Sequence, residues 1–100
     1  MSFVASIGND QYGADMLSSW AESGLNTDHV SRADGHTGSA LIMIGEGGTN
    51  YISAAPAAND QLLPERVDSL QSILSAARYI LIQFEIPELT TERILQYTLE

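Results

Sequence analysis

The chain has 100 residues, of which 44% are hydrophobic, so it contains enough apolar side chains for a folded core. It carries a net charge of −9 and only four basic residues, all scattered arginines, which excludes the concentrated basic face that nucleic-acid-binding proteins need. No apolar run approaches the roughly 20 residues that span a bilayer, the first residues do not resemble a secretory signal and cysteine is absent, so we expect a cytoplasmic protein without disulfides, membrane contact or thiolate-bound metal.

The first elements predicted are a strand and a helix. Residues 3–7 form a short apolar run before a Gly-Asn-Asp turn, which indicates a buried strand. A helix is expected over about residues 12–23, with Asp10 as its N-cap, because a carboxylate there can accept hydrogen bonds from first-turn amides. Capping explains Asp10 more simply than a role as catalytic acid or metal ligand. The apolar residues at helical spacing are Met16, Leu17 and Trp20. We expect them to face the core, and Trp20 to be a core residue in preference to a sugar-stacking platform.

The middle of the chain reads as β structure. A short strand is expected at 29–31, and two longer ones at 38–44 and 49–55. The connector between the longer strands is rich in glycine, which adopts turn conformations at little cost and predicts a β-hairpin. Ala40, Ile42 and Ile44 alternate with Leu41 and Met43, so both faces of this hairpin are apolar. Such a hairpin must be covered on both sides, or cover a ligand with one face and a partner with the other.

A loop at 56–60 and two helices with a strand between them complete the expected elements. Pro64 suits the first turn of a helix that reaches about residue 77. Its inward-facing residues are expected to be Val67, Leu70, Leu74 and Ala77. Residues 79–84 are almost continuously apolar, which predicts a strand covered on both faces. The last helix is expected to begin near Thr90. Its inward-facing residues are expected to be Ile94, Leu95 and Thr98.

The alternation of strands and helices predicts an α/β fold, a partial parallel sheet with flanking helices. The hairpin interrupts this alternation, so we expect it to protrude as a separate lid. Residues 1–27 and 60–100 are assigned to the α/β core portion of a larger domain, and residues 28–58 to the β-lid.

Five stretches of the chain form an ordered set of motifs. They are Ser6–Gly13, Thr37–Ile42, Gly45–Asn50, Pro56–Asn59 and Gln83–Pro87. In the same order, they resemble the Gly-x-Asp-x-x-Gly stretch, the Thr-Gly start of the lid strand, the lid turn, the Pro-Gly-Ala-Asn loop and the Gln-Leu-Glu-Ile-Pro segment of the ribokinase-like carbohydrate kinases, the PfkB family. The order and spacing agree over the whole chain. One departure is Ala57, where the family usually has glycine.

The resemblance implies a sugar site. Glu85 matches the glutamate that hydrogen-bonds a sugar hydroxyl, and Ala40, Ile42 and Ala54 match lid positions that contact the apolar side of a pentose. The resemblance also implies a homodimer formed through the lids. From the residues alone, Glu85 follows the strand expected at 79–84, at the edge where α/β sheets bind ligands. The alternative is that Glu85 caps the next helix or ends the strand at solvent.

Other polar residues remain open or unassigned. Asn59 either touches the hinge near the substrate or stabilises its own loop through side-chain hydrogen bonds. His29 and His36 are not paired with each other or with carboxylates at ligand spacing, so no metal site is predicted. No catalytic residue is assigned in this chain.

The rest of the family's machinery has no counterpart in these residues. The N-terminal sugar-binding motifs are missing, as is the Gly-Ala-Gly-Asp motif that supplies the base and the amides that hold the transferring phosphate. The sequence also contains no lysine and no P-loop. Because phosphoryl transfer depends on positioning and charge stabilisation around the γ-phosphate, we expect the chain alone to be inactive and to bind neither ATP nor Mg²⁺.

The resemblance therefore implies the sugar-binding and lid portion of an enzyme that uses ATP and Mg²⁺ to phosphorylate a small sugar such as ribose. The main alternative is a non-catalytic sugar-binding or oligomerisation module. A second alternative is an unrelated α/β domain with an accidental match.

Overall fold

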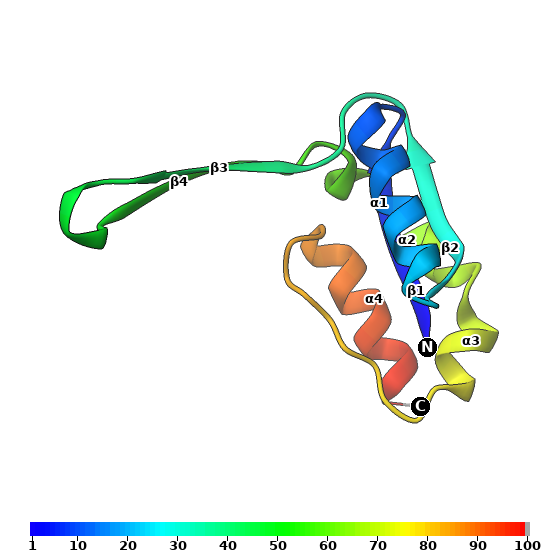
Figure 1. The fold of residues 1–100 in the computed structure, drawn as a ribbon. Coiled ribbons are helices and arrows are strands. Elements are labelled where there is room, and N and C mark those ends of the chain that lie inside the picture. Colours follow the sequence, from blue (N-terminus) through cyan, green and yellow to red (C-terminus); the bar gives the residue numbers. More distant parts are fainter. Residues whose placement is uncertain (100) are drawn as a thin grey trace.

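In the computed structural model, which describes residues 1–99, a small α/β body carries a long β-hairpin that projects away from it (Figure 1). The molecule measures 49 × 27 × 25 Å and has a radius of gyration of 15.2 Å. A compact domain of this length has a radius of gyration of about 13 Å. The projecting hairpin accounts for the elongated shape. Within the described residues, no helix is both long enough and apolar enough to cross a bilayer.

The body is built on a parallel strand pair. β1 (Ser2–Gly8) and β2 (Asn26–Ala33) run parallel, and α1 (Gln11–Glu22) makes the crossover between them. This arrangement confirms the α/β prediction, although β2 is longer than the strand expected at 29–31. The Phe3 and Trp20 rings meet edge to face, with centroids 4.7 Å apart, and join α1 to β1.

The core-facing stripe predicted on α1 is only partly present. Leu17 and Trp20 are half-buried, but the side chain of Met16 is 39% exposed. Met16 was therefore wrongly placed in the core. The reason is geometric, because the interface of α1 with β1 is centred on the Trp20 ring and on Gly13, the buried residue of the helix.

The core lies between β1 and the segment that follows the hairpin. That segment contains the 3₁₀ helix η2 (Ala57–Gln61) and the short helix α2 (Pro64–Asp68), with Pro64 in the first turn as expected. The buried apolar residues of the described chain are Ile7, Ala58, Leu62, Val67 and Leu70. This small core positions the root of the hairpin directly against β1.

The helix predicted over 64–77 is divided in two. α2 ends at Asp68, and α3 (Gln71–Ala76) begins after Leu70, whose φ of −109° and ψ of 11° are not helical. Val67 and Leu70 face inward as predicted and Leu74 is half-buried, but Ala77 is exposed. The chain thus changes direction at Leu70, and the Leu70 side chain is buried at this break.

The last helix, α4 (Glu88–Thr98), begins two residues before the predicted start. Its buried residues are Thr90 and Thr91, and the Thr90 hydroxyl donates a 2.6 Å hydrogen bond to the Leu62 carbonyl oxygen. Of the predicted inward-facing residues, Ile94 is half-buried, whereas Leu95 and Thr98 are exposed. The inward-facing stripe is therefore rotated from the predicted one.

The strand predicted at 79–84 does not form. The segment has irregular backbone, and its side chains at Tyr79, Leu81 and Phe84 are 79%, 92% and 80% exposed. A strand is defined by its neighbours, and within residues 1–99 the parallel sheet consists of β1 and β2 alone. An apolar run without a hydrogen-bonding partner cannot become a sheet strand.

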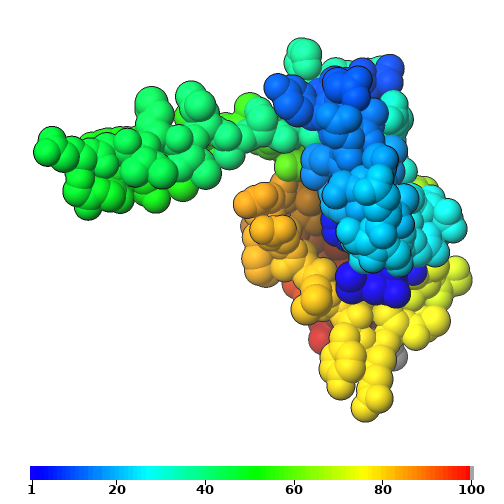
Figure 2. All heavy atoms as spheres, in the orientation of Figure 1, coloured from blue at the N-terminus to red at the C-terminus, as the bar shows by residue number. Residues whose placement is uncertain are grey.

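The hairpin itself agrees with the prediction. β3 (Ser39–Ile44) and β4 (Asn50–Ala55) pair antiparallel, and the turn η1 (Glu46–Gly48) joins them. Gly47 and Gly48 have φ values of 79° and 83°, which glycine adopts without a Cβ clash. Every residue of both strands is exposed, and in the view of Figure 2 the hairpin stands clear of the body.

Candidate functional site

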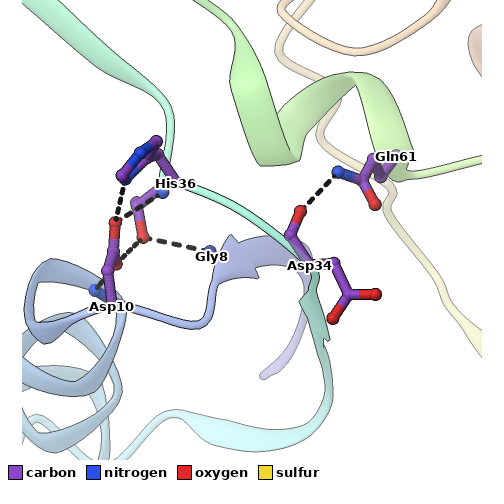
Figure 3. A network of polar contacts seen from close by, with 7 residues as sticks. Gly8, Asp10, Asp34, His36 and Gln61 are labelled. Atoms are coloured by element: carbon purple, nitrogen blue, oxygen red, sulfur yellow. Dashed lines mark hydrogen bonds and ion pairs between the residues drawn. The ribbon is translucent and has the colours of Figure 1, made fainter.

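The root of the hairpin is held by a network of hydrogen bonds centred on Asp10 and Thr37 (Figure 3). Asp10 Oδ2 accepts a 2.8 Å bond from the Thr37 amide, and Asp10 Oδ1 accepts a 2.6 Å bond from the Thr37 hydroxyl. The same hydroxyl accepts a 3.0 Å bond from the buried amide of Gly8. Asp10 Oδ1 also accepts a bond of 2.9 Å from Gly13, which caps α1 as predicted. One carboxylate thus serves the helix cap and the hairpin root together.

The electrostatics of Asp10 follow from these contacts. The hydrogen bonds from the Thr37 hydroxyl, the Thr37 amide and the Gly13 amide all favour the charged form, and they lower the pKa of Asp10 from 3.8 to about 2. His36 Nδ1 lies 3.8 Å from Asp10 Oδ2, but the His36 side chain is 91% exposed, so its contribution is small. Asp10 is therefore a charged hydrogen-bond acceptor at neutral pH.

Two glycines allow the backbone segments of this network to meet. A Cβ atom on Gly8 would lie 2.2 Å from the Thr37 amide nitrogen. A Cβ atom on Gly13 would lie 2.4 Å from the Gly8 carbonyl oxygen and 3.0 Å from Thr37 Oγ1. The glycines of the Gly-x-Asp-x-x-Gly stretch are thus required by the close approach of residue 8 to residue 37 and of residue 13 to residue 8.

The returning strand is attached to the same place. The Ala58 amide donates a 3.0 Å bond to the His36 carbonyl oxygen, and Gln61 Nε2 donates a 2.9 Å bond to the Asp34 carbonyl oxygen. A Cβ atom on Gly38 would lie 2.7 Å from Asn59 Nδ2. Asn59 therefore lies beside the root of the hairpin, and both its contact with a substrate and its stabilisation of its own loop stay predictions.

Ala57 has a φ of 46°, and it is the residue that stands where glycine is usual. This is the left-handed region, which costs an alanine about 1–2 kcal/mol relative to a right-handed conformation. The loop therefore keeps the conformation that a glycine would favour, at some expense of stability.

The predicted lid residues share one face of the hairpin. Ala40 and Ala54 are directly opposite each other in the β3–β4 register, and Ile42 is opposite Ile52. Because alternate residues point to the same side, these four side chains form one apolar face. Ile42 and Ile52 are 56% and 62% exposed, so this face is open to a ligand.

Glu85 lies in the irregular segment that leads into α4, and its side chain is exposed. This segment is on the same side of the body as the projecting hairpin (Figure 1). The expected place of Glu85 at the end of a sheet strand is wrong, because that strand does not form. Its bond to a sugar hydroxyl stays a prediction.

The residues present do not fit Mg²⁺-ATP. No group of three His, Cys, Asp or Glu side chains in the described part of the chain is arranged to hold a metal ion. The glycine-rich turn 45–48 lies at the tip of the hairpin and leads into a strand, whereas a phosphate cradle leads into a helix N-terminus.

The sequence of residues 1–98 matches the pfkB family carbohydrate kinase profile. The chain belongs to the pfkB family. Ribokinase from Schizosaccharomyces pombe (strain 972) is 31% identical over 97 residues, and the match covers 96% of this chain and 30% of that protein. This pfkB chain spans about a third of the length of most of the curated relatives it matches.

Solved structures support the fold of this pfkB chain. A ribokinase from Giardia lamblia superposes with a TM-score of 0.83 at 31% identity, over 98% of this chain and 31% of that one. Arabidopsis thaliana ribokinase, solved with ribose and ATP, superposes with a TM-score of 0.78 at 26% identity, over 97% of this chain and 34% of that one. The ribokinase-like fold assignment is confirmed.

Sequence reasoning missed the part that Thr37 plays in the pfkB chain. Thr37 was identified only as the start of the lid strand, although its hydroxyl and amide both bond to Asp10. Local pattern does not reveal a contact between residues 27 positions apart. The sequence did contain one signal of this contact. Asp10, a hydrogen-bond acceptor, lies between Gly8 and Gly13, and Thr37, a hydroxyl donor, directly precedes Gly38.

Proposed function

We propose that these residues form the lid and part of the sugar site of an ATP-dependent kinase that phosphorylates a small sugar such as ribose. The observation that carries this proposal is the pfkB match over residues 1–98, together with a hairpin at the position of the family's lid. In an intact kinase of this family, ATP and Mg²⁺ would be held by residues outside the part that this chain matches. The division into residues 1–27 and 60–100 as core portion and 28–58 as lid stays a prediction about that protein, as does its cytoplasmic location.

The hairpin would close over the sugar and exclude water, which favours transfer to the sugar over hydrolysis of ATP. Ala40, Ile42 and Ala54 would contact the apolar side of the ring, since they share one exposed face. Glu85 would accept hydrogen bonds from sugar hydroxyls as a carboxylate. Asn59 would act beside the hinge, where its side chain lies against Gly38.

On its own the chain would not transfer phosphate. It contains no lysine, and its glycine-rich turn 45–48 lies at the hairpin tip, away from any helix of the body. The exposed apolar side chains of residues 79–84 support a role inside a larger sheet, where neighbouring strands would cover them. Sugar binding and lid closure are thus the tasks that we assign to these residues.

A second candidate is an oligomerisation module, which the exposure of both hairpin faces favours. The side chains opposite the proposed sugar face include Leu41, Met43 and Tyr51, which are 63%, 55% and 65% exposed. Contiguous apolar surface of this kind marks an interaction site. In the kinase proposal this second face would pair with the lid of another subunit, whereas in the module pairing would be its whole task.

Calorimetric titration of ribose into the chain and into a Glu85→Ala variant tests the proposal. We expect heat of binding from the parent and a loss of at least about tenfold in affinity from the variant, because a charged hydrogen bond to a hydroxyl is removed. Glu92→Ala is the matched control, since Glu92 is also exposed but lies within α4. Equal heats from the parent and Glu85→Ala would contradict the role of Glu85. An absence of ribose binding by every chain, with association intact, would favour the module.

A further inference from the structure

We infer that Asp10 is a positioning residue, which clamps Thr37 and so fixes the direction in which the hairpin leaves the body. The lid would then turn about the residues beyond the clamp, Gly38 on the outgoing side and Pro56 and Ala57 on the returning side. This inference deepens the proposed function and rests on it where the hairpin is called a lid. The contact between Asp10 and Thr37 can be tested without any sugar.

Helix capping explains only part of the arrangement of Asp10. One bond, from the Gly13 amide to Oδ1, is sufficient for an N-cap. The carboxylate accepts two further bonds, both from Thr37, and one of them is the 2.6 Å bond from the hydroxyl. Charge-assisted bonds of this length are stronger than neutral ones. The carboxylate therefore joins α1 to the start of β3.

The amide and the hydroxyl of Thr37 both take part in hydrogen bonds of this network. Its amide and hydroxyl hydrogens both go to Asp10, and its hydroxyl oxygen accepts the Gly8 amide. Thr37 is 8% exposed, so water has little access to replace these bonds. A serine at this position would keep every polar contact. A valine would keep the shape but remove the hydroxyl, with its one donor hydrogen and its two acceptor lone pairs.

The returning strand, β4, is attached to the body at Ala58, three residues after the strand ends. Ala58 is 1% exposed and its amide bonds to the His36 carbonyl oxygen, so both legs of the hairpin are attached at residues 36–37 and 58. Between these anchors and the strands lie only Gly38 on one side and Pro56 and Ala57 on the other. Movement of the rigid hairpin must be absorbed there.

The test uses spin labels on two introduced cysteines, since the chain has none of its own. Ser18→Cys on α1 and Glu46→Cys at the hairpin tip are both exposed positions. Pulsed electron resonance then gives the distribution of distances between body and tip. We expect Asp10→Ser, which keeps a helix cap but is too short to reach Thr37, to broaden this distribution at least about twofold. We expect Thr37→Val to broaden the distribution likewise, and Thr37→Ser to retain the width seen in the parent.

Asp34→Asn is the matched control, because Asp34 is on the same connecting segment and its carboxylate points away from the network (Figure 3). It should leave the distribution unchanged. The inference is overturned if Asp10→Ser and Thr37→Val both retain the parent distribution, or if Asp34→Asn broadens it as much. Should either variant fail to fold, amide exchange of Thr37 in the unaltered chain decides. Protection supports the clamp, and exchange at the rate of a free peptide overturns it.

Ribose affinity provides the functional readout. If loss of the clamp reduces the share of molecules with a correctly directed lid to a tenth, the apparent dissociation constant rises about tenfold. Thr37→Ser should restore the parent affinity, which a merely destabilised fold would not. When no chain binds ribose, the proposed sugar site has failed, while the spin-label distances still decide whether Asp10 directs the hairpin.

Discussion

The hydroxyl of Thr37 donates a 2.6 Å hydrogen bond to Oδ1 of Asp10, a residue 27 positions earlier in the chain. This bond joins the N-terminus of α1 to the start of the hairpin, and it does so through a carboxylate that also caps the helix. Two of the five stretches that carry the family resemblance, Ser6–Gly13 and Thr37–Ile42, are therefore parts of one structural unit.

The depressed pKa of Asp10 predicts a specific dependence of stability on pH. Because folding lowers this pKa from 3.8 to about 2, the stabilisation is fully present above pH 3.8 and is lost as the pH falls towards 2. Asp10→Asn should therefore lower the free energy of unfolding at pH 6 and lose most of this difference at pH 2. Urea unfolding at several pH values measures it, with Asp34→Asn as the control for a lost charge. A pH-independent difference would contradict the assignment.

Ala57→Gly should stabilise the chain. Alanine at a φ of 46° is strained, and glycine removes this strain at the expense of a more flexible unfolded chain. We expect a net gain of about 0.5–1 kcal/mol in urea unfolding. Ala58→Gly is the adjacent control and should destabilise, because Ala58 is buried and has no positive φ. A loss of stability with Ala57→Gly would show that the methyl group contributes more than the strain removes.

The hairpin and the helix cap were predictable because their signals are local. Alternating apolar residues with a glycine-rich turn specify β3 and β4, and Asp10 precedes the helix it caps. The clamp at Thr37 was not predictable, since it depends on how two distant segments approach each other through Gly8 and Gly13.

The strand expected at 79–84, which does not form, illustrates a different limit of prediction from sequence. The apolar run in this segment indicates a buried environment, but it does not indicate what covers the segment or which strand pairs with it. The same limit applies to Glu85, whose place was derived from the end of that strand. The burial of Thr90 on α4 was also not predictable. A threonine is buried in this way only where its hydroxyl finds a partner, here the Leu62 carbonyl oxygen, and the sequence does not show that partner.

Thr90→Val should destabilise the body. Thr90 is fully buried, and its hydroxyl satisfies the carbonyl oxygen of Leu62, so valine keeps the shape but leaves a buried acceptor without its partner. We expect a loss of about 1–3 kcal/mol in unfolding free energy. Thr98→Val, on the exposed end of the same helix, should change stability by less than about 0.5 kcal/mol. Similar losses from both would indicate a general effect of valine on α4.

The two faces of the hairpin should separate sugar binding from association. Leu41 and Ile42 are adjacent on β3 and point to opposite sides, so each is the matched control for the other. In the proposed function Ile42 faces the sugar and Leu41 faces a second lid. Leu41→Glu should raise the dimer dissociation constant at least about tenfold, since a charge in an apolar interface loses its hydration, and should leave ribose affinity near that of the parent.

Ile42→Glu should do the reverse, weakening ribose binding while sedimentation still shows association. Sedimentation equilibrium and ribose calorimetry on the same three proteins measure both quantities. Equal effects of the two substitutions on both measurements would mean that the faces are not divided in this way. A parent chain that stays monomeric at high concentration would remove the dimer from the proposal, and the apolar face around Leu41 would then need a different cover.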